Sequence, residues 1–199
     1  MPRELVTIQV GQCGNQIGMK FWELALKEHS QNNKNGIYDD ALSSFFKNAI
    51  IVDMEEGVIN QMLKSDIGEI FDDRQFIHDV SGAGNNWAHG YHYYGNKYRE
   101  NIVNRIRKTV EECDSIQCFF LMHSLGGGTG SGLGSRILTI LKEEFPEVYR
   151  FTASVFPQKE DDVVTSPYNS MFSLNEIYQS ADCQKKRDLC RPKTKQIYL

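Results

Sequence analysis

Cysteine is scarce in this chain, and no two cysteines have the spacing of a metal-binding motif. The 199 residues include five cysteines, an odd number with no C-x-x-C pair, so the sequence predicts neither a disulfide framework nor a zinc site. No apolar run approaches the length of a membrane span, and no signal-peptide pattern follows Met1. These absences favour one soluble domain in a reducing compartment.

Charge of one sign gathers only at the end of the chain. The sequence has 22 Lys and Arg against 26 Asp and Glu, a formal net charge of −4. Residues 184–199 hold six basic residues and one acid, so the preceding chain is more acidic than the total indicates. An acidic body is a poor nucleic-acid binder, and we expect neither a nucleic-acid nor a membrane partner. The tail lacks an apolar period, which predicts disorder, with a localisation or partner signal as the alternative.

Five of the seven residues from Gly126 to Gly132 are glycine. An apolar run at 118–122 precedes this segment, and helix-spaced apolar residues follow it. A strand that leads through a glycine-rich turn into a helix is a phosphate-binding design, because freed backbone N–H groups and the helix N-terminus face an anion. The alternative, a flexible linker, is not normally placed between a buried strand and an amphipathic helix.

The glycine segment is neither a Walker P-loop nor a dinucleotide fingerprint. No Gly-Lys-Ser/Thr follows it, and no G-x-G-x-x-G occurs. Phosphate would therefore be bound by backbone amides, by the helix dipole and by the hydroxyls of Ser124, Thr129 and Ser131.

Strand-like and helix-like segments alternate along the chain. We expect strands at 5–10, 50–54, 116–123 and 149–156, and helices after a tight turn at 11–14, at 58–63, at 87–110, after the glycine segment and after Ser166. Ser166 has the character of an N-cap, since Pro167 follows it. This order predicts an α/β fold with a doubly wound, mostly parallel sheet that binds its ligand beyond the carboxyl ends of the strands.

Polar residues follow the first two predicted strands. Gln12 and Gln16 are one helical turn apart and can face one ligand, although exposed surface amides are the alternative. Cys13 could contact the same ligand or pack under the turn. Asp53 and Glu55 follow the second strand, and carboxylates beside a phosphate site recruit Mg²⁺; the alternative is acids that complement a helix N-terminus.

Other candidate residues point less clearly to chemistry. The loop at 82–86 offers a further set of backbone amides, and Asp161 with Asp162 could meet a ribose hydroxyl, with a solvated acidic loop as the default. We interpret His123, in an apolar strand, as a packed core histidine rather than a general base. No Ser/His/Asp or Cys/His catalytic grouping is evident.

Four motifs occur together in the order and register of one family. They are GQCGNQIG at 11–18, VDME at 52–55, GAGNNWA at 82–88 and GGGTGSG at 126–132, and Pro167-Tyr-Asn169 fits the same pattern. The chain resembles the tubulin family over about residues 4–183. Variants at 43–46, 55–57 and 160–162 are most similar to its epsilon class, which is associated with centrioles and basal bodies. A bacterial-type relative is the runner-up, which the matches at 14–18 and 85–87 disfavour.

The resemblance implies a cytoskeletal GTP-binding protein of the cytoplasm and centrosome that serves microtubule and centriole or basal-body organisation. Its partners would be other tubulin-family subunits or centriolar proteins. It implies GTP or GDP as ligand, with Mg²⁺ near Glu55 and Asp53. The nucleotide contacts that it implies are Gln12, Ser124, Gly128, Thr129 and Gly130, with secondary contacts at Gly11, Cys13, Gln16, Asn85, Gly126 and Gly127.

The chain also departs from the family pattern. The segment near 47–50 is shorter than in tubulins, Ser166 stands where many tubulins carry a glutamate, and the second half of the family fold is absent. We therefore expect an incomplete GTP-binding domain at 1–183 and a non-family tail at 184–199. The family is a GTPase, but this chain alone is expected not to hydrolyse GTP. A non-functional or partner-binding fragment and a small nucleotide-dependent enzyme are the alternatives; the missing dinucleotide fingerprint disfavours the second.

Overall fold

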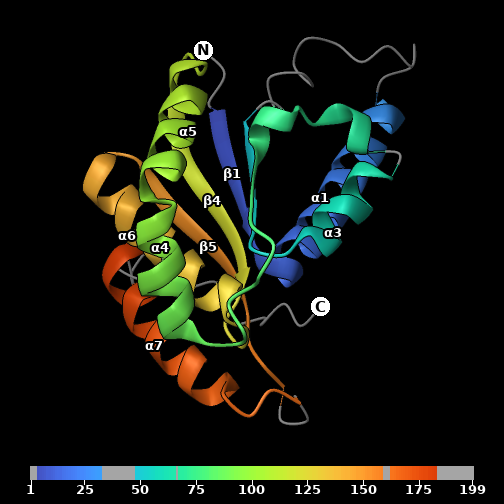
Figure 1. Ribbon diagram of the computed structural model, residues 1–199. Helices are drawn as coiled ribbons and strands as arrows, with labels where there is room; N and C mark the ends of the chain where they lie inside the picture. Colours follow the sequence, from blue (N-terminus) through green and yellow to red (C-terminus); the bar gives the residue numbers. More distant parts are fainter. Residues whose placement is uncertain (1–3, 33–47, 66, 159–161, 183–199) are drawn as a thin grey trace, which may run out of the picture.

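The computed structural model describes residues 4–32, 48–65, 67–158 and 162–182 (Figure 1). Five strands form one sheet in the order β3-β2-β1-β4-β5, and every neighbouring pair is parallel. The chain builds outward from β1 to β3 and then crosses to β4 and β5, so the winding reverses between β1 and β4. This confirms the predicted doubly wound α/β fold. The strands are β1 (Glu4–Val10), β2 (Ala49–Asp53), β3 (Phe76–His78), β4 (Ile116–Ser124) and β5 (Tyr149–Val155).

Helices cover both faces of the sheet. On one face lie α1 (Gly11–Asn32) and α3 (Glu56–Leu63), and on the other lie α5 (Arg99–Glu111), α6 (Gly134–Glu144) and α7 (Ser166–Ser180) (Figure 1). Because side chains alternate along a strand, the two faces bury separate cores. The larger core, beneath α5–α7, includes Val6, Ile8, Val10, Ile106, Ile137 and Ile177. The smaller, beneath α1 and α3, includes Trp22, Ile51, Ile59 and Met62.

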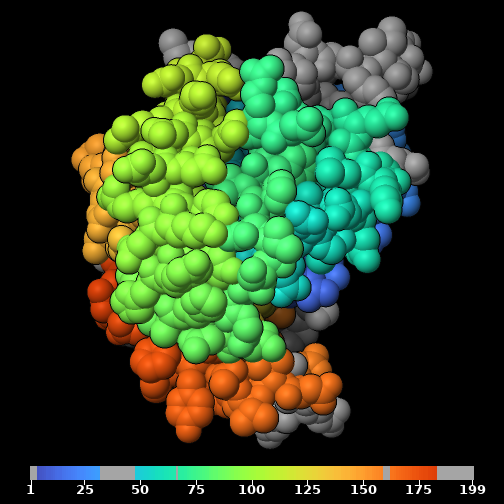
Figure 2. Space-filling model, in the orientation of Figure 1, coloured from blue at the N-terminus to red at the C-terminus, as the bar shows by residue number. Residues whose placement is uncertain are grey.

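The long helix predicted at 87–110 is present as an irregular helical run. It consists of a π-helical turn, η3 (His89–Tyr94), then α4 (Gly95–Lys97), and α5 after a break at Tyr98. Figure 2 shows this run covering a large part of one face of the molecule, with α7 below it. A second π-helical turn, η4 (Thr129–Leu133), opens α6.

The two π-helical turns touch backbone to backbone. A Cβ atom at Gly132 would lie 2.3 Å from the carbonyl oxygen of Trp87, and one at Gly90 would lie 2.4 Å from the carbonyl oxygen of Gly128. Any side chain at either position would therefore force the turns apart. The contact joins the start of the helical run directly to the glycine segment.

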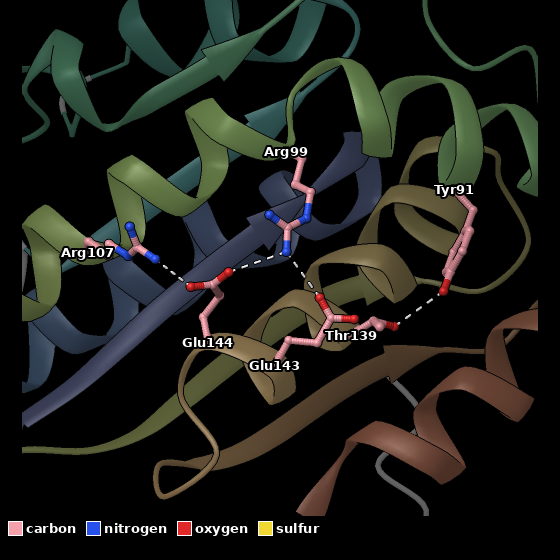
Figure 3. A network of polar contacts seen from close by, with 6 residues as sticks. All are labelled: Tyr91, Arg99, Arg107, Thr139, Glu143 and Glu144. Carbon is pink, nitrogen blue, oxygen red and sulfur yellow. Dashed lines mark hydrogen bonds and ion pairs between the residues drawn. The ribbon is translucent and has the colours of Figure 1, made fainter.

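A polar network holds the same helices together at the surface. Arg99 on α5 pairs with Glu143 at 3.2 Å and with Glu144 at 3.3 Å, and Arg107 pairs with Glu144 at 2.6 Å (Figure 3). The Tyr91 hydroxyl lies 3.5 Å from that of Thr139 on α6. These contacts fix the helical run against α6.

β5 lies at one edge of the described sheet, and its two faces differ. Tyr149, Phe151 and Val155 lie on the same face as α1 and are 47%, 36% and 38% exposed. On the opposite face the buried Arg150 pairs with Asp182 at 2.8 Å and donates to the carbonyl oxygen of Ser180 at 2.9 Å. Arg150 thereby anchors the end of α7 to the sheet edge.

The structure corrects three details of the sequence-based prediction. No tight turn separates β1 from α1, because the helix begins at Gly11 itself. Thr165, not Ser166, is the N-cap of α7, and Ser166 is buried in its first turn. The short strand β3 was not predicted, since three residues are too few to show alternation.

The predicted strand at 50–54 is β2, which runs from Ala49 to Asp53. The predicted disordered tail at 184–199, the variants at 43–46 and at Glu160, and part of the shortened segment near 47–50 lie outside the described residues.

Candidate functional site

Three segments meet beyond the carboxyl ends of the central strands. Gly11, at the end of β1, lies against the glycine segment, since a Cβ atom there would be 2.9 Å from the Gly130 nitrogen. A Cβ atom at Gly127 would be 3.8 Å from the Ser124 hydroxyl and 3.9 Å from the side-chain oxygen of Asn85. The first turn of α1 and the loops at 81–87 and 124–130 therefore surround one position. It coincides with the reversal of winding between β1 and β4, where doubly wound sheets bind ligands.

The glycine segment presents some of its residues outward and buries the rest. Ser124, Gly127 and Thr129 are partly exposed, whereas Gly126, Gly128 and Gly130 are buried. The Ser131 hydroxyl donates to the carbonyl oxygen of Gly127 and fixes the curve of the segment. The exposed members can face an anion at the N-terminal end of η4 and α6, as the sequence predicts.

His123 anchors the glycine segment from the core. Its Nδ1–H donates to the Gly130 carbonyl oxygen at 2.8 Å, and its Nε2 accepts from the Ser154 hydroxyl at 2.8 Å. The side chain is fully buried, and burial lowers its pKa to about 4. It is therefore neutral, and the prediction of a packed core histidine is confirmed.

The start of α1 supplies the next group of predicted residues. Gly11 has a φ of +74°, which few other residues adopt, and this lets the chain turn from β1 directly into the helix. Gln12 and Gln16 are both exposed, with the spacing of one helical turn. Cys13 is half-buried, and burial raises the pKa of its thiol, so it is not an activated nucleophile.

The loop after β3 has an unusual backbone. Gly82, Gly84 and Asn85 all have positive φ, at +64°, +57° and +53°, and Asn85 is the only non-glycine residue to do so in the described chain. Asparagine tolerates this conformation better than most residues. The exposed Asn85 lies near Gly127, whose added Cβ atom would be 3.9 Å from the side-chain oxygen of Asn85.

Sequence reasoning missed the residue that joins two of these loops. The Asn169 side-chain nitrogen on α7 donates to the carbonyl oxygens of Asn85 at 2.9 Å and Gly126 at 2.8 Å. Its side-chain oxygen accepts from the Trp87 backbone N–H at 3.0 Å. The signal was present, because small polar residues recur at helical spacing on the buried face of α7: Ser166, Asn169, Ser170, Ser173 and Ser180.

Two carboxylates stand beside these loops. Asp53 is buried and accepts from the Asn15 side chain at 3.4 Å and from the Glu55 backbone N–H at 3.3 Å. Burial is the main cause that raises the Asp53 pKa to about 6. Glu55 is exposed, and its carboxylate lies against Gly82, where a Cβ atom would be 2.3 Å from its oxygen.

The described residues contain no group of three or more His, Cys, Asp or Glu side chains that could hold a metal. Two carboxylates are nevertheless enough for Mg²⁺ when phosphate and water supply its other ligands. The carboxylates of Asp53 and Glu55 therefore fit this ion.

The family match agrees with this geometry. The model of the Tubulin/FtsZ family, GTPase domain, matches residues 4–185. The chain belongs to the Tubulin/FtsZ family. Tubulin epsilon chains of Mus musculus and Homo sapiens are 52% and 50% identical to it over 201 residues, which cover 89% of this chain and 42% of each relative. The tubulin beta-1 chain of Homo sapiens is 38% identical over 196 residues, 90% of this chain and 44% of the relative.

The chain therefore spans less than half the length of the tubulins that it matches. Within this tubulin-family domain the structure brings Gly11, Asn85 and the glycine segment close together. Asp161, for which a solvated acidic loop was the default and a ribose contact the alternative, lies outside the described residues, and Asp162 is exposed. None of the helices in the described part of the chain combines the length and apolar character needed to cross a membrane.

Proposed function

We propose that this chain binds GTP and GDP as the nucleotide-binding domain of a tubulin-like cytoskeletal protein. The observation that carries the proposal is the contact of Gly11 with Gly130 and of Asn85 with Gly127, which closes three segments around one position. The family match over residues 4–185 supports guanine nucleotide as the ligand.

The proposed roles follow from exposure. Ser124 and Thr129 offer hydroxyls, and the backbone amides of Gly126–Gly130 offer N–H groups, to the phosphates. The exposed side chains of Gln12, Gln16 and Asn85 offer amides. Gly11 lines the site with its backbone. Cys13 lies beside it in the first turn of α1. These groups bind and orient the nucleotide through hydrogen bonds and form no covalent bond to it.

Mg²⁺ is part of the proposal. Asp53 and Glu55 would hold it, directly or through water, beside the phosphate-facing loop. Bound there, the ion neutralises phosphate charge. The burial of Asp53 favours this role, because a nearby cation offsets the cost of a buried carboxylate.

The cellular role is proposed from the relatives. Two epsilon chains are 50–52% identical to this chain, compared with 38–40% for beta chains. We propose a role in microtubule and centriole or basal-body organisation, in the cytoplasm and at the centrosome. The partners proposed are other tubulin-family subunits or centriolar proteins.

Binding of fluorescent mant-GTP and mant-GDP to the purified chain, with and without Mg²⁺, tests the site. We expect saturable binding that Mg²⁺ strengthens and that unlabelled GTP displaces. Displacement by ATP measures selectivity for the base. No saturable binding by a chain with a cooperative unfolding transition would refute the proposal.

A further inference from the structure

The loop after β3 is held from behind by the helical run. The hydroxyl of Tyr94, in η3, donates to the carbonyl oxygen of Gly82 at 2.9 Å, and the Tyr94 side chain is 1% exposed. On its other side Gly82 donates its own N–H to the carbonyl oxygen of Met54 at 2.7 Å. Gly82 is thus fixed between the end of β2 and the π-helical turn.

A second tether lies three residues earlier, at Asp79. One oxygen of its carboxylate accepts from Lys97 Nζ at 2.6 Å and from the Tyr98 hydroxyl at 2.9 Å. The Asp79 backbone N–H donates to the carbonyl oxygen of Asp53 at 3.2 Å. Asp79 therefore joins the end of β2 to the helical run, as Gly82 does.

Lys97 connects the two tethers. Its ammonium lies 5.9 Å from the ring centre of Tyr93, 5.9 Å from that of Tyr94 and 5.1 Å from that of Tyr98, distances at which a cation is attracted to an aromatic ring. Lys97 and Asp79 each stabilise the charged form of the other: the pKa of Asp79 falls to about 2 and that of Lys97 rises.

We propose that Tyr94, Lys97 and Asp79 act as a latch, a set of positioning residues that sets the place of loop 79–86 in the nucleotide site. The inference rests on the proposed function and assigns these residues no contact with the nucleotide. They act through Gly82, against which the Glu55 carboxylate lies, and through Asn85.

The same helical run also contacts the glycine segment, so the latch is connected to the proposed phosphate-binding loop as well. Gly90 in η3 lies against Gly128, and Gly132 lies against Trp87. Removing the latch therefore loosens loop 79–86 against the glycine segment while both cores stay intact. Trp87, at the end of that loop, reports its position, whereas Trp22, the other tryptophan, is buried in the smaller core.

Three substitutions test the latch. Tyr94→Phe removes one hydroxyl and keeps the buried ring. Lys97→Met removes the cation from a side chain that is 46% exposed, so the fold is retained. Lys97→Arg restores a cation over the rings and is the rescue variant. Tyr178→Phe removes a hydroxyl from an exposed tyrosine on α7 and is the matched control.

Two readouts are needed for each variant. The first is the dissociation constant for mant-GTP with Mg²⁺. We expect it to rise several-fold in Tyr94→Phe, because the loosened loop must be ordered when the nucleotide binds, and to rise in Lys97→Met but not in Lys97→Arg or Tyr178→Phe. The second is the ¹⁹F spectrum of chain labelled with 5-fluorotryptophan. The Trp87 resonance should shift in Tyr94→Phe and Lys97→Met while the Trp22 resonance stays in place.

The outcomes separate the latch from the proposed function. Unchanged nucleotide affinity and an unmoved Trp87 resonance in both variants would overturn the latch. If the unsubstituted chain binds no nucleotide, the proposed function fails, and the Trp87 resonance alone then decides whether these residues position the loop.

Discussion

The side-chain nitrogen of Asn169 lies 2.8 Å from the carbonyl oxygen of Gly126, and this bond ties α7 to the glycine segment. The same nitrogen donates to the carbonyl oxygen of Asn85, so one side chain on α7 holds two loops of the candidate site at a fixed separation. The Thr165 hydroxyl, which donates to the carbonyl oxygen of Asn85 at 2.7 Å, and the Ser166 hydroxyl, which donates to that of Gly126 at 3.4 Å, lie beside it.

Replacement of Asn169 by alanine is therefore expected to destabilise the fold. It leaves the buried Gly126 carbonyl without this donor, and we expect the free energy of unfolding to fall by about 2–4 kcal/mol. Urea denaturation measures the change. Asn175→Ala, at an exposed position on the same helix, is the control and should change stability by less than about 0.5 kcal/mol. Equal effects of the two substitutions would contradict the assigned role.

Thr129→Val tests the hydroxyl at the phosphate-facing loop. Valine keeps the shape of threonine but removes the hydroxyl that we propose donates to a phosphate, and a hydrogen bond of that kind is worth about 1.5–3 kcal/mol. We expect about 10- to 100-fold weaker binding of mant-GTP with no loss of stability. Thr139→Val, which removes a hydroxyl from the network in Figure 3, should leave nucleotide affinity unchanged. If Thr129→Val does not change the affinity for mant-GTP, Thr129 has only a structural role.

Gly11→Ala is expected to break the contact between the first turn of α1 and the glycine segment. An alanine there is strained at a φ of +74° and places its Cβ 2.9 Å from the Gly130 nitrogen. We expect the free energy of unfolding to fall by about 1–3 kcal/mol from the backbone strain alone and nucleotide binding to be lost. Gly57→Ala, where a Cβ meets no atom within 4 Å, is the matched control. Because Gly57 lies in α3, alanine there should be neutral or stabilise by up to about 1 kcal/mol. A Gly11→Ala chain as stable as Gly57→Ala would disprove the steric argument.

The pKa of His123 predicts how stability depends on pH. Its folded pKa of about 4 lies below the ordinary value of 6.5. The contribution of the neutral side chain is therefore fully present above pH 6.5 and is lost as the pH falls toward 4. A shift of this size corresponds to about 3 kcal/mol. Asp53, whose pKa is raised to about 6, acts in the opposite direction over much of the same range.

The measurement is the difference in unfolding free energy between the unsubstituted chain and His123→Gln at each pH, in which the effect of Asp53 cancels. This difference should shrink as the pH is lowered from 6.5 to 4. A difference that stays constant with pH would show that His123 does not titrate in this way.

Glu55→Gln tests the proposed Mg²⁺ site. Glu55 is exposed, so the substitution should leave the fold intact. We expect a several-fold increase in the Mg²⁺ concentration needed for half-maximal strengthening of mant-GTP binding, because one of two carboxylates is lost. Glu56→Gln, at the exposed neighbouring position, should have no such effect. Equal Mg²⁺ dependence in both variants would place the ion elsewhere.

Four of the five strands, most of the helices and the loops at 82–86 and 126–132 could be predicted because each depends on local pattern. Apolar runs mark β1, β2 and β4, and the glycines at 126–132, which permit conformations that other residues rarely adopt, indicate a turn between a strand and a helix. His123 was correctly placed in the core for the same reason, since its neighbours in β4 are apolar.

The remaining features depend on partners far apart in the sequence. The bond from Tyr94 to Gly82 needs the position of η3 relative to β3, which no local period encodes. The two π-helical turns meet where Gly90 lies against Gly132, a contact between segments far apart in the sequence that no local pattern indicates. Pro167-Tyr-Asn169 fitted the family pattern, but the role of Asn169 depends on the two carbonyl groups that it bonds, in segments far from it in the sequence.

The uneven exposure of β5 governs how the purified chain behaves in solution. An edge strand with apolar side chains at every second position is a template for pairing with another molecule. Self-association would bury Tyr149, Phe151 and Val155, so it should grow with concentration and show first in light scattering. We expect dilution, or a Phe151→Lys substitution that places a charge on this edge, to reduce self-association. Titrations performed at high concentration would otherwise record aggregation together with ligand binding.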